Sequence, residues 1–455
     1  MRNWNPLYNY QSYQRLKRTG VFKSSPPIVL ASGFIALILL GTLLLSLPIA
    51  THQPISIFKA FFMATSAVTV TGLTVIDPGT DLTNFGQIVL ISLVQLGGLG
   101  FVTFAVVSAI ALGKKLSLNY QALALEAFNQ TSVSRIRRTA FSVIKISLVI
   151  EITAAIILTL WWWRDYPFLT ALYRAIFHTI AAFNNAGFSL FPSSLSQFVG
   201  DPITVLTITF LIILGGIGFS VLSDVAHKRS WARLLPYTKV ILLGTLALNL
   251  IGFVLLWAME FRNPDTLGSL TLHGQGLAAW MQTVTARTAG FTTIDVTKLQ
   301  DSSTLLMILL MFIGGGSLST ASGIKIGTFI VLLAAVYSYI FQRKEVVLLK
   351  RSIDPAVVQK ALALVLVTST LAFFSLMLMT MMESQPFLSL LFEVISAIST
   401  TGLTLDLTPQ LSMPSQILIA FLMFAGRLGP LTLIYSLATQ KRSRVGYPST
   451  EFQVG

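Results

Sequence analysis

The short run TVTGL at residues 69–73 stands between two strongly apolar stretches, residues 28–48 and 85–112. Similar polar runs, each with a glycine, follow it along the chain: NNAGF at 184–188, RTAGF at 287–291 and TTGL at 400–403. Their central glycines are Gly72, Gly187, Gly290 and Gly402, each a little more than a hundred residues beyond the one before. Recurrence at nearly constant spacing indicates internal repeats.

A second glycine feature follows each of these runs. The four copies are GGLG from Gly97, GGIG from Gly215, GGGS from Gly314 and GRLG from Gly426. Each begins at almost the same offset from the central glycine of its own run. Two features repeated four times at matched spacing predict four copies of one unit: a span, a short re-entrant helix, a polar turn and a second span.

Composition places these units in a membrane. The chain has 455 residues, of which 54% are hydrophobic and 11% charged, with a mean hydropathy of +0.76. Soluble domains carry about 25% charged residues. Eight apolar runs are long enough to cross a bilayer: 28–48, 85–112, 141–163, 203–223, 238–259, 303–339, 358–382 and 413–437. Four shorter ones are not: 56–68, 170–183, 275–286 and 387–398. We therefore expect an all-α polytopic membrane protein.

The net charge of +14 follows the same pattern. Lys and Arg gather at both termini and in the segments 114–145, 228–239 and 343–360, whereas the alternate connections carry most of the acids. This alternation is the positive-inside rule, and it predicts a multi-pass protein of the cell membrane with both termini in the cytoplasm. Because topology explains most of the basic residues, we expect no nucleic-acid partner.

The charge pattern also orients the repeats. All four polar turns fall between basic-flanked spans, so they are expected to face the same, outer side. Parallel repeats of this kind suit packing around one pseudo-fourfold pore, unlike inverted repeats. The predicted organisation, in chain order, is: cytoplasmic segment 1–27, repeat 1 at 28–112, loop 113–140, repeat 2 at 141–223, loop 224–237, repeat 3 at 238–341, loop 342–357, repeat 4 at 358–437 and cytoplasmic tail 438–455.

Irregular backbone at membrane depth is tolerated only where protein buries it or where it lines a water-filled path. Four such turns on one axis bring carbonyl oxygens together, and carbonyl rings that replace a cation's hydration shell are the basis of potassium filters. Glycine favours this arrangement because it adopts positive φ. The alternative is that each glycine is only the C′ cap of a helix. We predict a K+ site, the selectivity filter, made of Val70, Thr71, Gly72, Asn185, Ala186, Gly187, Thr288, Ala289, Gly290, Thr400, Thr401 and Gly402.

The run GGGSLSTASG at 314–323 interrupts an apolar stretch that is too long for one span. Glycine costs about 1 kcal/mol per helical position relative to alanine, so this run should not stay helical. Its offset from Gly290 along the chain predicts a gate below the filter, and the alternative is a kinked, tightly packed helix crossing. The predicted gate residues are Gly314, Gly315, Gly316, Ser317, Ser319, Thr320, Ser322, Gly323, Lys325 and Arg427.

Charged residues inside apolar segments are expected to be functional, since a central charge costs about 2.5–3.5 kcal/mol on insertion scales. Lys325 directly follows the glycine-rich run, and Arg427 lies at the same repeat offset in GRLGP. Either side chain can donate hydrogen bonds to loop carbonyls and hold a gate closed. Glu393 in the fourth short helix is expected to brace the filter from behind, with Arg287 or Arg174 as its partner.

Together these motifs resemble those of the Ktr/Trk/HKT superfamily of potassium transporters. The motifs are TVTGL, FNNAGFS, RTAGF and TTGLT, with GGLGF, GGIGF, GGGSLSTASGIK and GRLGP. The resemblance covers residues 26–455 and is greatest to the KtrB group, the membrane subunits of Ktr potassium-uptake systems. It implies one potassium-conducting pore per chain, a homodimer, and a cytosolic ring of KtrA-like regulators that carry the nucleotide. It also implies potassium import that sodium often assists.

The resemblance bears on selectivity as well. No repeat contains the TVGYG run of tetrameric potassium channels, so the filter is expected to be shorter or looser. In the superfamily, serine at the first filter-glycine position accompanies sodium permeation, so Gly72 favours potassium. The segment matching residues 314–323 is an intramembrane loop that obstructs the path.

Two other classes of function call for different features. A membrane-embedded enzyme needs converging carboxylates, a metal pair or an activated nucleophile, whereas the chain has no cysteine, no HExxH motif and no aspartate cluster in its apolar runs. We therefore expect no enzyme. A sodium or ammonium pathway of similar architecture remains the alternative within transport.

Overall fold

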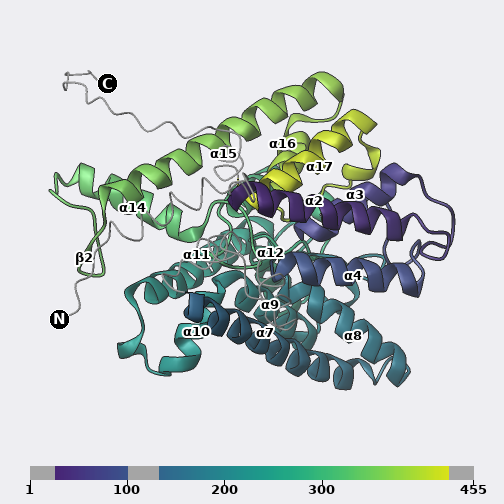
Figure 1. Cartoon of the computed structure of the whole chain (residues 1–455). Helices are drawn as coiled ribbons and strands as arrows, with labels where there is room; N and C mark the ends of the chain where they lie inside the picture. The colour runs from purple at the N-terminus through teal and green to yellow at the C-terminus, as the bar shows by residue number, and fades with distance from the viewer. Residues whose placement is uncertain (1–25, 101–132, 430–455) are drawn as a thin grey trace, which may run out of the picture.

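The structure, a computed structural model, describes residues 26–100 and 133–429, and this part of the chain is almost wholly helical. The helices form four groups in chain order (Figure 1). Group one contains α2 (Pro26–Leu45), α3 (Ile57–Thr69) and α4 (Asn84–Gly98). Group two contains α7 (Val133–Trp162), α8 (Phe168–Phe183), α9 (Pro202–Ile217) and α10 (Phe219–Lys228). Group three contains α11 (Pro236–Glu260), α12 (Leu272–Thr285), α13 (Asp301–Phe312) and α14 (Ile326–Ile340). Group four contains α15 (Pro355–Met382), α16 (Phe387–Ile398) and α17 (Met413–Leu428).

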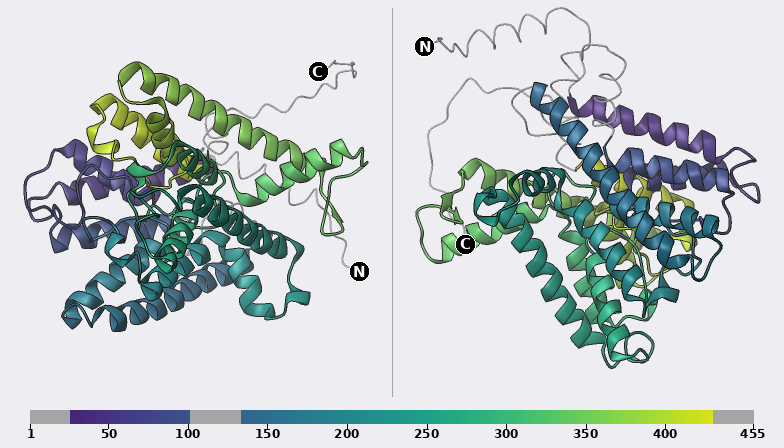
Figure 2. Two further views of the ribbon diagram at one scale, coloured as in Figure 1. Left: turned by 180° about the vertical axis from the view of Figure 1, so that it is seen from behind. Right: turned by 90° about the horizontal axis from the view of Figure 1, so that it is seen from below.

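Short elements connect these helices. Single 3₁₀ turns lie at η1 (Ser196–Phe198), η2 (Trp231–Arg233), η3 (Val296–Lys298) and η4 (Thr408–Gln410). The strands β1 (Val347–Leu348) and β2 (Arg351–Ser352) pair antiparallel between α14 and α15. This hairpin extends to one side of the molecule, away from the short helices (Figure 2). The expectation of an all-α membrane architecture is confirmed apart from this hairpin. Most of the predicted segments 1–27, 113–140 and 438–455 lies outside the described residues, as do the ends of the predicted spans 85–112 and 413–437.

The four groups pack in a closed cycle. In groups one, two and four the short helix contacts both the helix before it and the helix after it, as α3 does with α2 and α4; in group three α12 contacts the preceding helix α11. Between groups, the helix after the polar turn contacts the short helix of the next group: α4 with α8, α9 with α12, α13 with α16, and α17 with α3. The last contact places helix α17, yellow in Figures 1 and 2, beside the purple helices α2 and α3 of group one. Each short helix is therefore enclosed by two groups.

The first helix of groups two, three and four is long and apolar enough to cross a bilayer: Phe141–Trp162, Pro236–Glu260 and Pro355–Met382. Large apolar side chains on these helices point outward, with Ile152, Leu250 and Phe373 exposed. In a membrane, hydrocarbon tails cover such faces.

The helices after the polar turns are shorter than the sequence predicted. The helices α4, α9, α13 and α17 have 15, 16, 12 and 16 residues, whereas a straight span needs about 20. The predicted span 203–223 is not one straight helix, because α9 ends at Ile217 and α10 leaves it at 100°. Gly218 makes this bend with φ of +103°, a conformation that glycine adopts readily. The predicted span 303–339 is likewise divided into α13, a loop and α14.

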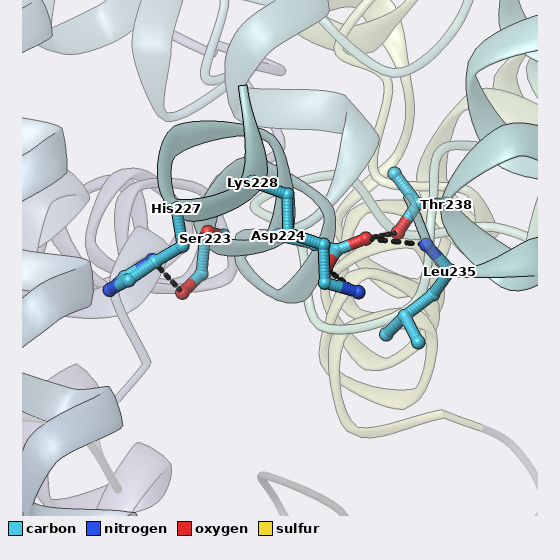
Figure 3. Close-up of polar contacts among 6 residues, drawn as sticks. All are labelled: Ser223, Asp224, His227, Lys228, Leu235 and Thr238. Carbon is cyan, nitrogen blue, oxygen red and sulfur yellow. Dashed lines mark hydrogen bonds and ion pairs between the residues drawn. The ribbon is translucent and has the colours of Figure 1, made fainter. Parts of the chain in front are cut away.

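A polar cluster at the end of α10 fixes the segment after the bend. The Asp224 carboxylate accepts hydrogen bonds from Leu235 N at 2.9 Å and Thr238 Oγ1 at 2.8 Å, and it pairs with Lys228 Nζ at 2.8 Å. Figure 3 shows how these groups join α10 to the start of α11. The direction of α10 is therefore set at both of its ends.

The structure explains the second glycine feature. A Cβ on Gly97 would overlap the carbonyl oxygen of Val68 in the last turn of α3. Gly215 and Gly426 face the carbonyls of Phe183 and Ile398 in the same way. Helices α4, α9 and α17 thus approach the ends of α3, α8 and α16 so closely that only glycine fits. Group three differs, because Gly314 faces Ser322 of the following loop instead.

We predict that Gly97→Ala destabilises the protein by about 1–3 kcal/mol, because the added methyl group must displace backbone rather than a flexible side chain. Thermal unfolding of the detergent-purified protein measures this change. The matched control is Gly276→Ala, since a Cβ there meets nothing within 4 Å and the site lies in helix α12. Equal melting temperatures for the two variants would contradict the close approach of α4 to α3.

Candidate ion pathway

The four short helices end in closely similar turns. The residue after or shortly after each helix end has a left-handed backbone: Val70, Asn185, Thr288 and Thr400, with φ of +58°, +59°, +73° and +48°. In groups one, two and four the next N–H donates back five residues, and each of these bonds is 2.8 Å long: Thr71 to Ser66, Ala186 to Ala181, and Thr401 to Ser396. This is the Schellman pattern, with the left-handed residue at C′.

The central glycines therefore do not cap the helices. Each lies two residues beyond its left-handed residue and has a positive φ of its own: +94° at Gly72, +68° at Gly187, +82° at Gly290 and +83° at Gly402. The alternative in which each glycine is the C′ residue is wrong, because a non-glycine residue takes that place in every turn. The glycines must serve another purpose.

That purpose is the approach of one group to the next. A Cβ on Gly187 would lie 2.8 Å from Ala289 O, and a Cβ on Gly290 would lie 2.7 Å from Thr401 O. A Cβ on Gly402 would overlap Thr71 O, and one on Gly72 would overlap Ala186 O. Each glycine thus faces the carbonyl of the residue that precedes the glycine of a neighbouring group, and the sequence of contacts returns to its start.

We call this closed set the carbonyl ring: the carbonyls of Thr71, Ala186, Ala289 and Thr401 with the four central glycines. Within the described residues, no hydrogen bond reaches any of these four carbonyl oxygens. The other predicted filter residues, Val70, Asn185, Thr288 and Thr400, are the C′ residues just before the ring. The structure therefore brings all twelve together around one axis.

The electrostatics of the ring favour a cation. The short helices all end at the ring, and each C-terminus is equivalent to about half a negative charge, so four of them supply about two. The carbonyl dipoles add to this charge. The buried hydroxyls of Thr288, Thr400 and Thr401 have no partner in the described part of the chain. A ring of unpaired carbonyls and helix C-termini can coordinate a cation that has lost its water.

The segment between α13 and α14, residues 313–325, is not helical; we call it the α13–α14 loop. It is hydrogen-bonded to the end of α9, with Gly316 N donating to Gly216 O at 2.7 Å and Phe219 N donating to Leu318 O at 2.8 Å. Gly315 and Gly316 pack against the carbonyls of Gly216 and Ile217. The alternative of a kinked helix crossing is therefore wrong, since the backbone leaves the helix altogether.

Basic side chains hold this loop. Arg427 of α17 donates to Thr320 O at 2.5 Å and, with its other terminal nitrogen, to Gly97 O of α4 at 2.5 Å. Lys325 Nζ donates to Ala321 O at 2.6 Å. Arg427 thus connects the loop to groups one and four, whereas Lys325 closes the end of the loop on itself.

The loop also reaches the turn of group two. The hydroxyl of Thr320 lies 3.2 Å from Phe183 O and 3.1 Å from Asn185 Oδ1. The distance along the chain from Gly290 predicted a loop below the filter. In the structure the loop contacts Asn185, the C′ residue directly before the ring carbonyl of Ala186. Sequence separation carries no sign of this contact, because Thr320 and Asn185 belong to different groups.

The expected arginine partners of Glu393 are wrong. Its Oε1 accepts hydrogen bonds from the hydroxyls of Thr404 and Thr408, the latter at 2.9 Å, and both residues follow the turn of group four. Arg174 lies over the rings of Tyr166 and Phe191 instead. Glu393 contacts the segment behind the ring without forming an ion pair in the described residues.

Arg287 has a different role from the one expected of it. It donates to Asn249 Oδ1 of α11 at 3.1 Å and to Gly314 O at 3.3 Å, the first carbonyl of the glycine-rich run. A cavity of about 10 Å³ lies beside it, and within the described ranges Arg287 Nε and Thr245 Oγ1 have no hydrogen-bond partner. This volume fits one water molecule, which would satisfy both atoms.

A helical membrane fold with four groups around a ring of unpaired carbonyls is typical of a transport protein rather than an enzyme. The chain belongs to the TrkH family, described as cation transport proteins, which matches residues 23–444. It is 44% identical to the Ktr system potassium uptake protein B of Bacillus subtilis, over 95% of this chain and 97% of that protein. The protein of the same name from Vibrio alginolyticus is 41% identical, over 95% and 96% of the two chains.

Two further likenesses concern function and fold. The potassium/sodium uptake protein NtpJ of Enterococcus hirae is 33% identical, over 95% of this chain and 97% of that protein. The crystal structure of the potassium transporter TrkH from Vibrio parahaemolyticus matches with a TM-score of 0.70 at 21% identity, covering 92% of this chain and 86% of that one. This structural match shows a common fold.

We predict that Arg427→Gln loosens the α13–α14 loop, because the variant loses the charge-assisted bonds to Thr320 O and Gly97 O. The chain has no cysteine, so Ser317→Cys supplies a unique label on the loop. A charged, membrane-impermeant thiol reagent should modify this cysteine severalfold faster in the Arg427→Gln background. The control is Arg343→Gln, whose side chain contacts Tyr337 of α14 and lies outside the loop. Equal modification rates in the two backgrounds would contradict the tether.

Proposed function

We propose that this chain is the potassium-conducting membrane subunit of a potassium-uptake system. The observation that carries the proposal is the carbonyl ring, in which turns from four groups bring carbonyls without a hydrogen-bond donor in the described residues against one another's glycines in a closed cycle. Such a ring is the chemistry of a potassium filter. The names of the relatives support potassium as the ion, since two proteins above 40% identity are potassium uptake proteins. The twelve residues at and before the ring are the proposed selectivity filter.

The α13–α14 loop is the proposed gate. Its helical hydrogen bonds are already absent, so a displacement breaks few further bonds. Arg427 and Lys325 donate to its carbonyls and hold it in its observed position. Helix α10 offers a route to it from the proposed cytoplasmic side, because Phe219 at the start of α10 donates to Leu318 and Asp224 near its end fixes the chain to α11.

The proposal extends to partners and topology. The relatives are named as component B of a Ktr system, which supports an assembly with further subunits. In this chain those subunits are a second copy, forming a homodimer, and a cytosolic ring of KtrA-like regulators that carry the nucleotide. The basic segments 228–239 and 343–360 supply the face on which a cytosolic partner docks. Both termini then lie in the cytoplasm.

A second candidate is a pathway that also uses sodium. The name of NtpJ, a potassium/sodium uptake protein at 33% identity, favours it. The two candidates share the ring and differ in how strictly it prefers potassium. Measured uptake of each ion by the parent protein separates them.

We predict that Gly72→Ser and Gly290→Ser each lower potassium preference and raise sodium entry. A side chain at either position meets the carbonyl of a neighbouring group and must displace part of the ring. Uptake of both ions is measured in cells deficient in potassium uptake. Gly276→Ala is the control, since its Cβ lies in open space. Unchanged affinity and ion preference in both serine variants at parental expression would remove the filter assignment.

We predict that deleting residues 317–319 raises potassium flux at least about tenfold in proteoliposomes without any partner. A shift from mostly closed to mostly open needs about 5.5 kcal/mol of differential binding, and the deletion supplies part of it. Thr320 and its contacts with Arg427 remain in the shortened chain. A monodisperse variant with flux equal to or below the parent would show that the loop does not obstruct the path.

A further inference from the structure

Thr320 is the residue of the α13–α14 loop that touches the carbonyl ring's supporting turns. Its side chain is 1% exposed, and its hydroxyl lies within hydrogen-bond distance of Phe183 O and Asn185 Oδ1. Phe183 is the last residue of α8, and Asn185 is the C′ residue directly before the ring carbonyl of Ala186. The loop therefore contacts the turn of group two through this side chain.

The number of hydrogen-bond donors limits how the groups at this contact can pair. A hydroxyl has one hydrogen, so Thr320 donates to only one of its two neighbours. Asn185 Nδ2 is buried and has no partner in the described part of the chain. Flipping the Asn185 amide turns Nδ2 toward the hydroxyl and satisfies both groups: Asn185 donates to Thr320, which donates to Phe183 O. The hydroxyl of Thr320 then joins both Phe183 and Asn185 to the loop.

The backbone of Thr320 fixes this side chain in place. Thr320 N donates to Gly215 O at 3.2 Å, and Thr320 O accepts from Arg427 at 2.5 Å. The position of the hydroxyl therefore follows the position of the loop. The other C′ residues have no such support among the described residues: Val70 is apolar, and the hydroxyls of Thr288 and Thr400 are without a partner.

We propose that Thr320 is a positioning residue for ion selectivity: its hydroxyl holds the turn of Asn185, and through it the ring carbonyl of Ala186, in the geometry that prefers potassium. This inference rests on the proposed function. It follows that ion preference and loop position are coupled, since a displaced loop releases the turn. Coupling is reciprocal, so a cation in the ring also stabilises the loop in its observed position.

The test compares three variants in proteoliposomes, with the potassium-to-sodium permeability ratio as the readout. Thr320→Val keeps the shape and removes the hydroxyl, and it should lower the ratio about tenfold, which corresponds to about 1.4 kcal/mol. Thr320→Ser restores the hydroxyl and should restore the ratio. The control is Thr368→Val, which removes a buried hydroxyl of helix α15 that donates to Leu364 O at 2.8 Å; it should keep the parental ratio.

A second variant probes the same contact from the other side. Asn185→Gly keeps the left-handed backbone at no steric cost and removes the amide. It should shift the ratio as Thr320→Val does, and the double variant should shift it no further than either single one, since both changes break one interaction. This pair keeps the proposal falsifiable if one variant fails to fold.

The outcomes distinguish a failure of the proposed function from a failure of the role assigned to Thr320. A parent protein without potassium preference contradicts the proposed function itself. A selective parent with an unchanged ratio in Thr320→Val and Asn185→Gly contradicts only the role of Thr320. An equal loss of preference in Thr368→Val and Thr320→Val also overturns it, because selectivity would then follow the loss of any buried hydroxyl and not this contact.

Discussion

The constraint on which the structure depends is that backbone carbonyls at membrane depth need a partner. Four turns leave their helices there, and four carbonyls accept no hydrogen bond in the described residues. A bilayer tolerates such groups only where they line a polar path. The left-handed residues before them, among them Val70 and Thr400, cost about 1–3 kcal/mol each and persist because the surrounding helices fix them. In the proposed function, coordination of an ion supplies the partner that these carbonyls lack.

Close packing of the groups follows from this constraint. The ring carbonyls converge only if backbone meets backbone, and that requires glycine both in the turns and in the helices behind them. Gly97, Gly215 and Gly426 let α4, α9 and α17 approach the ends of the short helices. Group three breaks the symmetry, because Gly314 begins a loop where its counterparts end a helix. The chain therefore combines three groups that only build the ring with one that also carries the α13–α14 loop.

The glycine register was readable from the sequence because it is periodic and independent of side-chain packing. It predicted the short helices at 57–69 and 387–398 to within a residue or two, and the turn residues that it picked out lie together at the carbonyl ring. What it missed depends on hydrogen bonds outside the repeated motifs. The bend at Gly218 is set by a bond to Leu318, and the partners of Glu393 are threonines beyond its own turn. Neither contact could be predicted from the local sequence. Apolar periodicity predicts where helices form, but it does not predict which helices and side chains contact each other.

The ring and the loop use the same chemical group in opposite ways. In the ring the carbonyls have no hydrogen-bond donor among the described residues, and in the proposed function they face a cation. In the loop, Arg427 occupies Thr320 O, Lys325 occupies Ala321 O, and Arg287 occupies Gly314 O. Carbonyls bound to cationic side chains offer little to a passing cation, and the side chains repel it, most strongly where water is scarce. As the proposed gate, a loop held in this way opposes conduction by charge as well as by bulk, so opening it requires the basic side chains to move along with the backbone they hold.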